Sequence, residues 1–504
     1  MLSVVYTTSI IGIEASLVEV EVDCSSGLPL FIIVGLPDAA VNESKERIML
    51  AIKNAGLPFP GGRIIVNLAP ADVKKEGSSF DLPIALGILA ATGMIEQERI
   101  KAIVMGELSL DGSVRPVSGV LPSALLAAKM EEKCIIAPEE NGYEAAAVPE
   151  IEAFTISHLK ELPPFFNDGK KNKVNFNFPD FVHKPEYDFQ LVKGQQHVKR
   201  ALEITAAGRH NVLMSGAPGS GKSLMAKTLP TIFPRLTFQE SLETTQIYSV
   251  RGYTSKENPV VVERPFRSPH HSASEVGLIG GGTNPLPGEV SLAHNGVLFL
   301  DEFTEFKRNI IDALRQPLED KKITISRSKL TATFPADFML VAACNPCPCG
   351  NKNHPYKECI CSPVEVKRYM SKLSGPILDR IDLQVEVNPI KEEDFRRPDS
   401  HSETSEQIRE RVQKAAEIQH KRFEGTKIRC NASMSDKQVK EFCKLEHEVQ
   451  ELMYQAVQRF GLSARSYSRV LKVSRTIADL AGSPSIERSH ISEAIQYRCP
   501  DSFR

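Results

Sequence analysis

The segment GAPGSGKS places glycines, a lysine and a serine at a spacing that cradles nucleotide phosphates. It follows the apolar run NVLM and precedes LMAKTL, so a strand should enter it and a helix should leave it. In such a loop backbone N–H groups surround the phosphates, the lysine reaches the β and γ oxygens, and the serine hydroxyl binds Mg²⁺. The segment therefore predicts an ATP–Mg²⁺ site made of Gly216, Ala217, Pro218, Gly219, Ser220, Gly221, Lys222 and Ser223.

Acidic and amide side chains follow two later apolar runs. Asp301 and Glu302 end GVLFLDEF, and Asn345 ends FMLVAACN. Asp301 would hold Mg²⁺ through water, Glu302 would polarise the attacking water, and Asn345 would orient the same water. The alternatives are a strand that happens to end in two acids and a simple turn asparagine. With a phosphate loop in the same chain, we favour a hydrolytic site.

Four cysteines follow Asn345 in the pattern C-x-C…C-x-C. Four thiolates would form a tetrahedral zinc site that fixes the loop 344–362, with His354 as an alternative ligand for one sulfur. The cysteines of each pair are separated by one residue, fewer than the usual two to four, so reduced cysteines in a polar loop are the alternative. Cys344 lies on the apolar run and is expected in the core. The candidate zinc ligands are Cys347, Cys349, Cys359 and Cys361.

The elements that must position these residues fall into distinct parts. Residues 1–165 alternate strand-like and helix-like runs and predict a mixed α/β domain. Residues 166–187 are rich in Asn, Lys and Pro and read as a linker whose phenylalanines could dock on a neighbour. Residues 188–392 predict a second α/β unit that contains the phosphate loop, and 393–504 predict a helical subdomain.

Composition narrows the function only slightly. A chain of 504 residues is expected to form two or three domains, and a net charge of −2 means that any nucleic-acid contact must come from local patches. The first residues lack a basic region, and Glu14, Glu19 and Glu21 interrupt their apolar pattern. No run reaches membrane-spanning length. We therefore expect a cytoplasmic protein without a membrane partner, in which the cysteines are thiols or metal ligands.

Over residues 188–504 these motifs resemble the AAA+ ATPases, with Asn345 as the first sensor. The resemblance implies two arginines. In LSGPILDRIDL, Arg380 matches the finger that reaches the γ-phosphate of a neighbouring subunit; a surface ion pair with an adjacent aspartate is the alternative. In GLSARSYSRVLKVSRTIADL, Arg465 matches the second sensor, and Arg469 is a weaker candidate. A finger supplied by a neighbour implies a ring, most simply a hexamer.

Two insertions resemble those of the AAA+ branch that contains magnesium chelatases and MCM helicases. One is the long Gly/Pro-rich segment ERPFRSPHHSASEVGLIGGGTNPLPGEVSLAHNG, expected to lack regular structure, and the other is the hairpin KITISRSKLTATF. In helicases of that branch both project into the ring channel, where basic side chains grip phosphates without reading bases. A solvated basic turn is the alternative. The candidate DNA contacts are Arg327, Lys329, Arg267, His270 and His271.

The first domain contains a segment, KKEGSSFDLPIAL, that resembles the nucleophile segment of Lon proteases, with Ser79 on the catalytic serine. Lon pairs that serine with a lysine as general base. In the matching stretch RPVSGVLPSALLAAK the lysine's place is taken by Leu121, so Lys74, Lys75 or Lys129 would have to substitute. We expect a Lon-like, S5-like domain without proteolytic activity, kept for assembly or DNA binding.

Taken end to end, the chain resembles the ComM/YifB family of magnesium chelatase-like proteins. SGLPLFIIVGLPDAAVNESKERI, FRSPHH and CNPCPCG belong to that family's pattern. The resemblance implies a hexameric ATP-dependent DNA helicase that promotes branch migration in natural transformation, on single-stranded and branched DNA of any sequence. It implies ATP and Mg²⁺ as cofactors, and the cysteine spacing adds structural zinc to that expectation. The alternatives are a motor subunit for metal insertion into a porphyrin, an ATP-dependent Lon-like protease, and a DNA-binding scaffold regulated by ATP.

Overall fold

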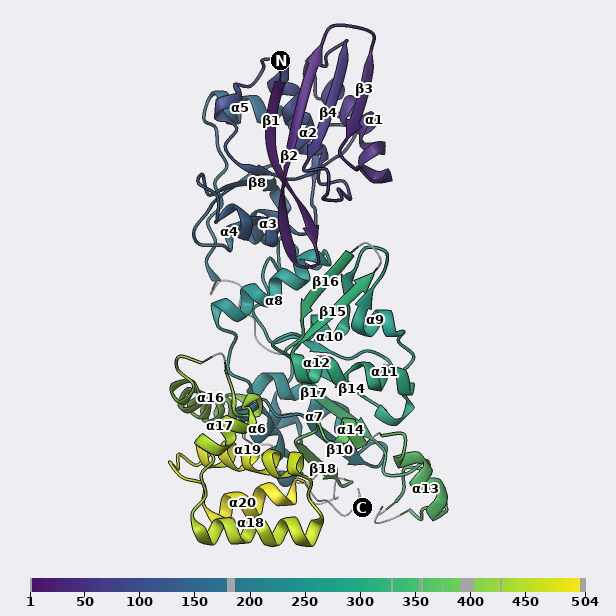
Figure 1. Ribbon diagram of the computed structural model, residues 1–504, viewed down its shortest axis with the longest axis vertical. Helices are drawn as coiled ribbons and strands as arrows, with labels where there is room; N and C mark the ends of the chain where they lie inside the picture. The colour runs from purple at the N-terminus through teal and green to yellow at the C-terminus, as the bar shows by residue number, and fades with distance from the viewer. Residues whose placement is uncertain are drawn as a thin grey trace.

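The computed structural model describes residues 2–178, 186–327, 330–352, 354, 357–373, 375–389, 403–426 and 428–498. Figure 1 shows an N-terminal α/β domain at the top, a second α/β unit in the middle and a group of helices at the lower left. The predicted fold class is thereby confirmed. No helix in the described part of the chain combines the length and apolar character that a membrane crossing needs.

The N-terminal domain is built on a mixed sheet with the strand order β3-β4-β2-β1-β5-β8-β9. Alternation creates its core: Val18, Val20 and Val22 of β2 are fully buried, whereas the glutamates between them are partly exposed. The all-apolar run predicted as a buried helix is α2, in which every residue is buried. The elements are β1 (Leu2–Ile11), β2 (Glu14–Ser25), β3 (Leu30–Val34), α1 (Ala39–Asn54), β4 (Arg63–Ala69), α2 (Asp81–Ala91), β5 (Ile103–Val104), β6 (Glu107–Leu108), β7 (Val114–Arg115), α3 (Val120–Ala127), β8 (Cys134–Pro138), α4 (Gly142–Ala146), β9 (Glu152–Ile156) and α5 (Leu162–Asn167).

The segment expected to be a linker is partly attached to this domain. It starts inside α5, and its backbone then runs beside β9, where Thr155 N–H donates to the Asn172 carbonyl at 3.0 Å and Val174 N–H to the Ala153 carbonyl at 3.0 Å. Phe176 and Phe178 pack against a core cluster shared with the second unit. The remaining linker positions, 179–185, lie outside the described residues.

The second unit is centred on a five-stranded parallel sheet with the order β11-β14-β17-β10-β18. Successive residues of β10, β14 and β17 belong alternately to two core clusters, so both faces of this sheet are covered. The elements are α6 (Gln196–Gly208), β10 (Val212–Gly216), α7 (Lys222–Thr228), α8 (Phe238–Val250), β11 (Phe266–Arg267), α9 (Glu275–Ile279), β12 (Gly280–Gly281), β13 (Leu286–Pro287), α10 (Glu289–Leu292), β14 (Val297–Leu300), α11 (Arg308–Ala313), α12 (Arg315–Asp320), β15 (Lys322–Arg327), β16 (Leu330–Pro335), β17 (Met339–Cys344), α13 (Pro363–Met370), α14 (Gly375–Leu378) and β18 (Leu383–Val387).

The Gly/Pro-rich insertion is more ordered than its composition predicts. It supplies β11 to the main sheet, a short helix α9 capped by Ser274, the hairpin β12–β13 and the short helix α10. The expectation of a structureless loop was therefore wrong, because two-residue strands are too short to show a period. The second predicted insertion is confirmed as the antiparallel hairpin β15–β16, with Lys322 opposite Pro335 at its base.

The C-terminal helices share a continuous apolar core with one face of the central sheet. Helix α16 starts at a capping box in which Thr404 and Gln407 satisfy each other's backbone N–H groups. These helices form the lid of the second unit. They are α16 (Ser405–Arg422), α17 (Asp436–Phe442), α18 (His447–Phe460), α19 (Ala464–Leu480) and α20 (Arg488–Gln496).

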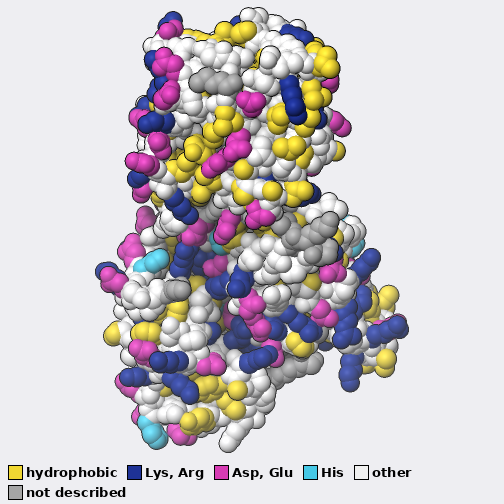
Figure 2. All heavy atoms as spheres, turned by 45° about the horizontal axis from the view of Figure 1, so that its top comes forward, with side chains coloured by type: hydrophobic (Ala, Val, Ile, Leu, Met, Phe, Trp, Pro, Cys, Tyr) yellow, Lys and Arg dark blue, Asp and Glu magenta, His cyan; other side chains and the backbone are white. Residues whose placement is uncertain are grey.

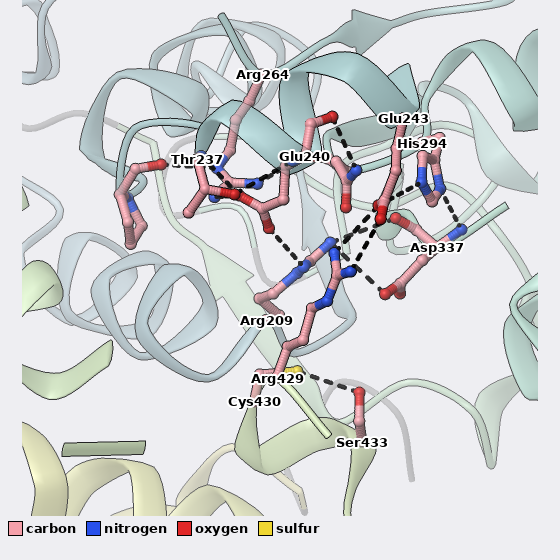
Figure 3. A network of polar contacts seen from close by, with 12 residues as sticks. Arg209, Thr237, Glu240, Glu243, Arg264, His294, Asp337, Arg429, Cys430 and Ser433 are labelled. Atoms are coloured by element: carbon pink, nitrogen blue, oxygen red, sulfur yellow. Dashed lines mark hydrogen bonds and ion pairs between the residues drawn. The ribbon is translucent and has the colours of Figure 1, made fainter. Parts of the chain in front are cut away.

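A buried ionic cluster joins the core to the lid (Figure 3). Glu240 of α8 lies 3.1 Å from Arg264 Nη2 and 3.7 Å from Arg209 Nη1, and all three side chains are at most 16% exposed. One turn later Glu243 accepts two hydrogen bonds, 3.1 and 3.2 Å, from Arg429 of the segment after α16. The cluster thus links lid and core through charges as well as apolar packing.

The N-terminal domain contacts the same helix α8. Gln246 donates a 2.7 Å hydrogen bond to the Ile13 carbonyl at the β1–β2 turn, and Gly119 N–H donates to the Ser249 carbonyl at 3.0 Å. Ile13 also packs against the cluster that contains the hairpin β15–β16. Figure 1 shows the β1–β2 tip directly above α8 and β16. The first domain is therefore attached to α8 and to the hairpin β15–β16 rather than to the nucleotide loop.

Candidate nucleotide-binding site

The phosphate loop connects β10 to α7, as its flanking sequence predicts. Gly219 and Gly221 have φ values of +77° and +91°, which glycine adopts without strain. Ser220 is 2% exposed, and its hydroxyl has no hydrogen-bond partner among the described residues. A buried hydroxyl without a partner, at the centre of a glycine-rich turn, fits a loop whose remaining partner is a ligand phosphate.

Lys222 lies folded over this loop. Its ammonium donates to the carbonyls of Gly216 at 2.7 Å and Ala217 at 2.9 Å, and lies 3.5 Å from Asn345 Oδ1. Burial lowers the pKa of Lys222, and the nearby Asp301 carboxylate opposes that shift. A bound triphosphate would replace weak carbonyl acceptors with charged oxygens, so the lysine is positioned for that exchange.

The residues predicted to bind Mg²⁺ are in contact. Ser223 Oγ donates to Asp301 Oδ2 at 2.7 Å, although the two residues are 78 positions apart in sequence. One hydroxyl and one carboxylate beside a phosphate loop are oxygen ligands of the kind that Mg²⁺ takes together with phosphates and water. The donor set therefore fits the ion, and Ser223 and Asp301 would hold it.

Glu302 projects beside this pair from a left-handed backbone position, φ +50°. Its Oε2 lies 3.2 Å from Nδ1 of His271, whose ring centroid lies 4.0 Å from that of His270. His271 was predicted to contact DNA; the structure places it against the predicted catalytic glutamate. The Gly/Pro-rich insertion is thus connected to the hydrolytic residue.

Asn345 follows β17 and faces the same space. A cavity of about 550 Å³ is lined by Glu302, Asn345, Tyr369 and Arg368 among others. The Tyr369 hydroxyl accepts a hydrogen bond from Thr304 Oγ1 at 2.5 Å and lies near the Asn345 backbone N–H, which tends to lower its pKa. Burial raises the pKa of Tyr369 to about 12, so it remains a neutral phenol.

The two arginines implied by the AAA+ resemblance have different surroundings. Arg380 is 9% exposed, forms an ion pair with Glu319, and donates to the Pro376 carbonyl at 2.6 Å. Arg465 is exposed in the first turn of α19. Arg469 forms an ion pair with the buried Asp382, which accounts for it as a structural residue.

Burial lowers the pKa of Arg380; Glu319 opposes that shift, and Arg465, Arg315 and Arg469 add to it. Arg465 is therefore close enough to Arg380 to act on its charge. Neither arginine pairs with the phosphate loop of its own chain in the contacts described above.

The candidate DNA-binding residues separate into two groups. Arg327 is exposed at the end of β15, and its Nη2 lies beside the β12–β13 hairpin, 3.7 Å from where a Cβ would stand on Gly281. Arg267 instead forms a bidentate pair with Glu289, at 2.6 and 2.8 Å, and His270 bonds Ser272. Lys329 lies outside the described residues. The two insertions are adjacent, and Arg327 is an exposed cation at the described end of β15, with Lys322 exposed at the base of the same strand.

The four cysteines converge as predicted. Their sulfur atoms all lie within 4.8 Å of one another, with separations of 3.4 Å for Cys347–Cys349 and 3.6 Å for both Cys347–Cys359 and Cys349–Cys359. A zinc ion with bonds of about 2.3 Å places its sulfurs about 3.8 Å apart. Backbone N–H groups of Asn351 and Ile360 lower the pKa of Cys349 to about 6. His354 Nδ1 accepts from the Lys357 N–H at 3.2 Å. The cluster has the size and donors of a Cys₄ zinc site.

The Lon-like segment lacks a dyad at the matching position. Leu121 is fully buried in α3, and its backbone N–H donates to Glu144 and to Ser249 of α8. Lys75 is also buried; its ammonium bonds the Pro70 carbonyl, and burial lowers its pKa. Lys74 pairs with Glu76. The position that holds the general base in Lon is therefore taken by Leu121, a buried residue in the contact between the first domain and α8.

A basic surface lies beside the site. Figure 2 shows Lys and Arg side chains gathered on the protrusion at the right, the part that carries α13. The exposed cations there lie on the cysteine loop, on α13 and directly after that helix. They are Lys357, Lys367, Arg368 and Lys372.

Sequence reasoning missed three residues that complete the site. Tyr369 lies near the Asn345 backbone N–H, Glu319 holds Arg380, and Gly350 packs against the phosphate loop at Pro218. No local pattern shows what they contact, because each acts on a residue distant in sequence. The capping box at Ser362, which starts α13 directly after the last cysteine, was the available signal for Tyr369.

Family models of magnesium chelatase subunits match most of the chain. The model described as magnesium chelatase, subunit ChlI matches residues 188–395, that of subunit ChlI of Mg-chelatase matches 20–141, and that of the subunit ChlI C-terminal region matches 402–498. Competence protein ComM of Haemophilus influenzae is 44% identical over 504 residues, covering 99% of this chain and 97% of that protein. The uncharacterized protein YifB of Escherichia coli is 41% identical over 502 residues, with 99% and 97% covered.

A more distant match covers a smaller share of this chain. The DNA replication licensing factor Mcm2 of Drosophila melanogaster is 26% identical over 211 residues, which are 38% of this chain and 20% of that protein.

Proposed function

Because the chain belongs to the ComM/YifB family of magnesium chelatase-like AAA+ ATPases, we propose that it is an ATP-driven DNA translocase that promotes branch migration during natural transformation. One observation carries the proposal: Lys222, Ser223, Asp301, Glu302 and Asn345 converge from the ends of three parallel strands. The full-length relative in Haemophilus influenzae, named a competence protein, supports the biological setting.

Within one chain each residue has a defined task. Bound Mg²⁺ would neutralise phosphate charge. Ser223 and Asp301 hold that ion, while Lys222 turns from loop carbonyls to the β and γ oxygens. Glu302 takes the proton of the attacking water, and Asn345 orients that water from the opposite side. The cavity of about 550 Å³ beside them leaves room for the water and for a group from outside the chain.

The pocket is completed by a neighbouring subunit. Arg380 is held by Glu319 near Arg465, and we propose that both reach the neighbour's phosphates. A guanidinium supplied in this way stabilises the charge of the transition state. The proposal therefore includes a ring, most simply a hexamer, because every pocket then receives one finger.

We propose that DNA is gripped by the adjacent insertions. Arg327 is exposed where the β15–β16 hairpin lies against β12–β13, and Lys329 follows it in sequence. Phosphate contacts from a hairpin tip carry no base information, so single-stranded and branched DNA of any sequence would serve. His271 belongs to the Gly/Pro-rich insertion, and its contact with Glu302 connects that insertion to the hydrolytic residue. A protein that uses ATP and acts on chromosomal DNA would work in the cytoplasm, where both are found.

We further propose one structural zinc ion, held by Cys347, Cys349, Cys359 and Cys361. The sulfur separations of 3.4–3.6 Å support it. Its role there is to fix a loop, since four thiolates leave no open coordination position for chemistry.

The test is the ATPase rate of the purified chain with and without single-stranded and branched DNA, read with its mass in solution. We expect DNA to raise the rate and Mg·ATP with DNA to assemble the ring. Glu302→Gln, which keeps the size of the side chain, should bind ATP and DNA but lose both hydrolysis and branch migration. A chain that stays monomeric, or a rate raised only by a porphyrin-binding partner, would contradict the proposal. So would casein degradation lost in Ser79→Ala.

A further inference from the structure

The cysteine loop is attached to the nucleotide site at both of its ends. It begins at Asn345, two residues before Cys347, and ends at Cys361, from which α13 starts with the capping residue Ser362. Helix α13 then returns to the site through Tyr369, whose hydroxyl accepts a hydrogen bond from the Thr304 hydroxyl and which lines the same cavity as Asn345, near its backbone N–H. Loop and helix therefore form a closed circuit around the water-orienting asparagine.

The middle of the loop touches the phosphate loop. Gly350 has a φ of +78°, and a Cβ built on it would lie 2.5 Å from Cδ of Pro218. Its N–H donates to the Cys347 carbonyl at 3.0 Å, in a turn that also leaves the Lys352 N–H 3.3 Å from the Cys347 sulfur. The cysteine turn is thus the outer wall of the phosphate loop, and only a residue without a side chain fits between them.

Apolar packing contributes little to holding this segment in place. Ile360 is 86% exposed and Val364 is 76% exposed, while Cys347 is the buried member of the cysteine cluster. Fixing the backbone of a residue costs about 1–2 kcal/mol, and a polar loop without a core must recover that cost elsewhere. Metal–thiolate bonds supply such a constraint in small loops.

We propose that the metal in this cluster is a positioning element of the ATP site: it fixes Asn345 and the outer wall of the phosphate loop, so that its loss stops turnover while nucleotide binding persists. The inference rests on the ATPase and zinc proposals above and adds that the two are coupled. It assigns Tyr369 and Gly350 as positioning residues, which act through Asn345 and Pro218.

The experiment uses the full-length chain and three variants. Zinc is measured by mass spectrometry of the gel-filtered protein, and ligation by the visible spectrum of the cobalt-loaded form. We expect one zinc per chain in the native protein and in the control Cys24→Ser, which removes a thiol of β2 outside the cluster. Cys359→Ser, at the exposed cysteine, should lose the metal and about 10²-fold in kcat, the scale of a small misplacement of a reacting group. Its affinity for a fluorescent ADP should stay within about threefold, because Lys222 and the loop backbone remain.

Tyr369→Phe tests the coupling in a chain that keeps all four sulfurs. It removes one hydroxyl from the circuit, and we expect full zinc content, unchanged ADP affinity and about tenfold lower kcat, the scale of one lost hydrogen bond. This variant decides the matter even where Cys359→Ser does not fold.

Four results would overturn parts of the inference separately. If the native protein contained no zinc, the assignment of a metal to this cluster would be wrong. A zinc-free Cys359→Ser chain with native kcat removes the coupling and leaves the ATPase and zinc proposals standing. If the Tyr369→Phe chain kept the native kcat, the claim that Tyr369 positions Asn345 would be wrong. A zinc-loaded native chain that does not hydrolyse ATP removes the proposed function itself, and with it the inference.

Discussion

Replacing Glu240 by glutamine tests how much the buried ionic cluster stabilises the second unit. The carboxylate lies between Arg264 and Arg209, at 3.1 and 3.7 Å (Figure 3). Both Glu240 and Arg264 side chains are only 10% exposed. Glutamine keeps the size and an oxygen acceptor, so the change removes the charge and little else. The substitution leaves the positive charges of Arg264 and Arg209 buried near each other without the carboxylate that neutralises them.

The expected cost follows from that burial. Removing one partner of a buried ion pair costs about 3–5 kcal/mol, and the retained amide oxygen favours the lower end, about 3 kcal/mol. Unfolding entropy of about 2 cal/mol/K per residue gives about 0.6 kcal/mol/K for a unit of roughly 300 residues, such as core plus lid. The melting temperature of that unit should therefore fall by about 5 °C.

The assay is differential scanning calorimetry at neutral pH, in which the transition of core and lid is followed. The matched control is Glu150→Gln, because Glu150 is 71% exposed and lies 3.7 Å from Lys133. That pair belongs to the N-terminal domain and should contribute less than about 1 kcal/mol there, so the transition of core and lid should stay where it is in the native protein. If Glu240→Gln melted like the control, the buried carboxylate would not stabilise the unit, and the reasoning from burial would be wrong.

The pH dependence adds a second check on Glu240. Burial tends to raise the pKa of its carboxyl, but Arg264 and Arg209 outweigh that effect and hold the pKa below its ordinary value. A depressed pKa stabilises the fold above the unfolded value of about 4.3, and that stabilisation is lost as pH falls through the folded value. The difference between native protein and Glu240→Gln should thus shrink as the pH is lowered below about 4.3. A difference that stayed constant would contradict the assignment.

Four further substitutions test the site. Lys222→Ala should abolish ATP and ADP binding in a fluorescence titration; retained affinity would mean that the loop does not bind phosphate. Arg380→Ala should keep binding but lower turnover about 10³-fold, and mixing it with Lys222→Ala should restore activity in rings that combine a good pocket with a good finger. Arg327→Ala should weaken DNA binding equally for all sequences and reduce the slope of log K against log salt by about 1. His271→Ala should raise the ATPase rate without DNA, because it releases Glu302; an unchanged rate would show that the contact between the two side chains does not restrain the glutamate.

The chemistry of the site could be predicted because it is encoded at the ends of strands. Carboxyl ends of neighbouring parallel strands meet at one sheet edge, so residues after β10, β14 and β17 had to gather. The contact of Ser223 with Asp301 and that of Lys222 with Asn345 follow from this rule. The cysteine cluster was predictable for a related reason, since four thiols within 15 positions can meet without help from the rest of the fold.

The supporting contacts could not be predicted, because packing over long sequence distances sets them. Arg267 is the type of residue that contacts phosphates, yet its position on β11 brings its guanidinium into a hydrogen bond with Glu289. His271 belongs to a polar, Gly/Pro-rich segment, yet the short strand before it directs its ring to Glu302. Sequence gives residue types within such a segment, whereas the pairing of a two-residue strand decides which way they face.

The surroundings of Arg380 bear on how a ring would distinguish ATP from ADP. In the single chain this guanidinium is compensated by Glu319, and burial together with Arg465 and Arg469 makes its charge costly there. To act on a neighbour's nucleotide it must leave that carboxylate, and only a group with comparable negative charge replaces the lost compensation. A γ-phosphate provides such a charge at the pocket's edge, whereas ADP leaves that position to water. Engagement of the finger should therefore depend on the nucleotide state of the adjacent pocket, which links hydrolysis in one subunit to the contact made by the next.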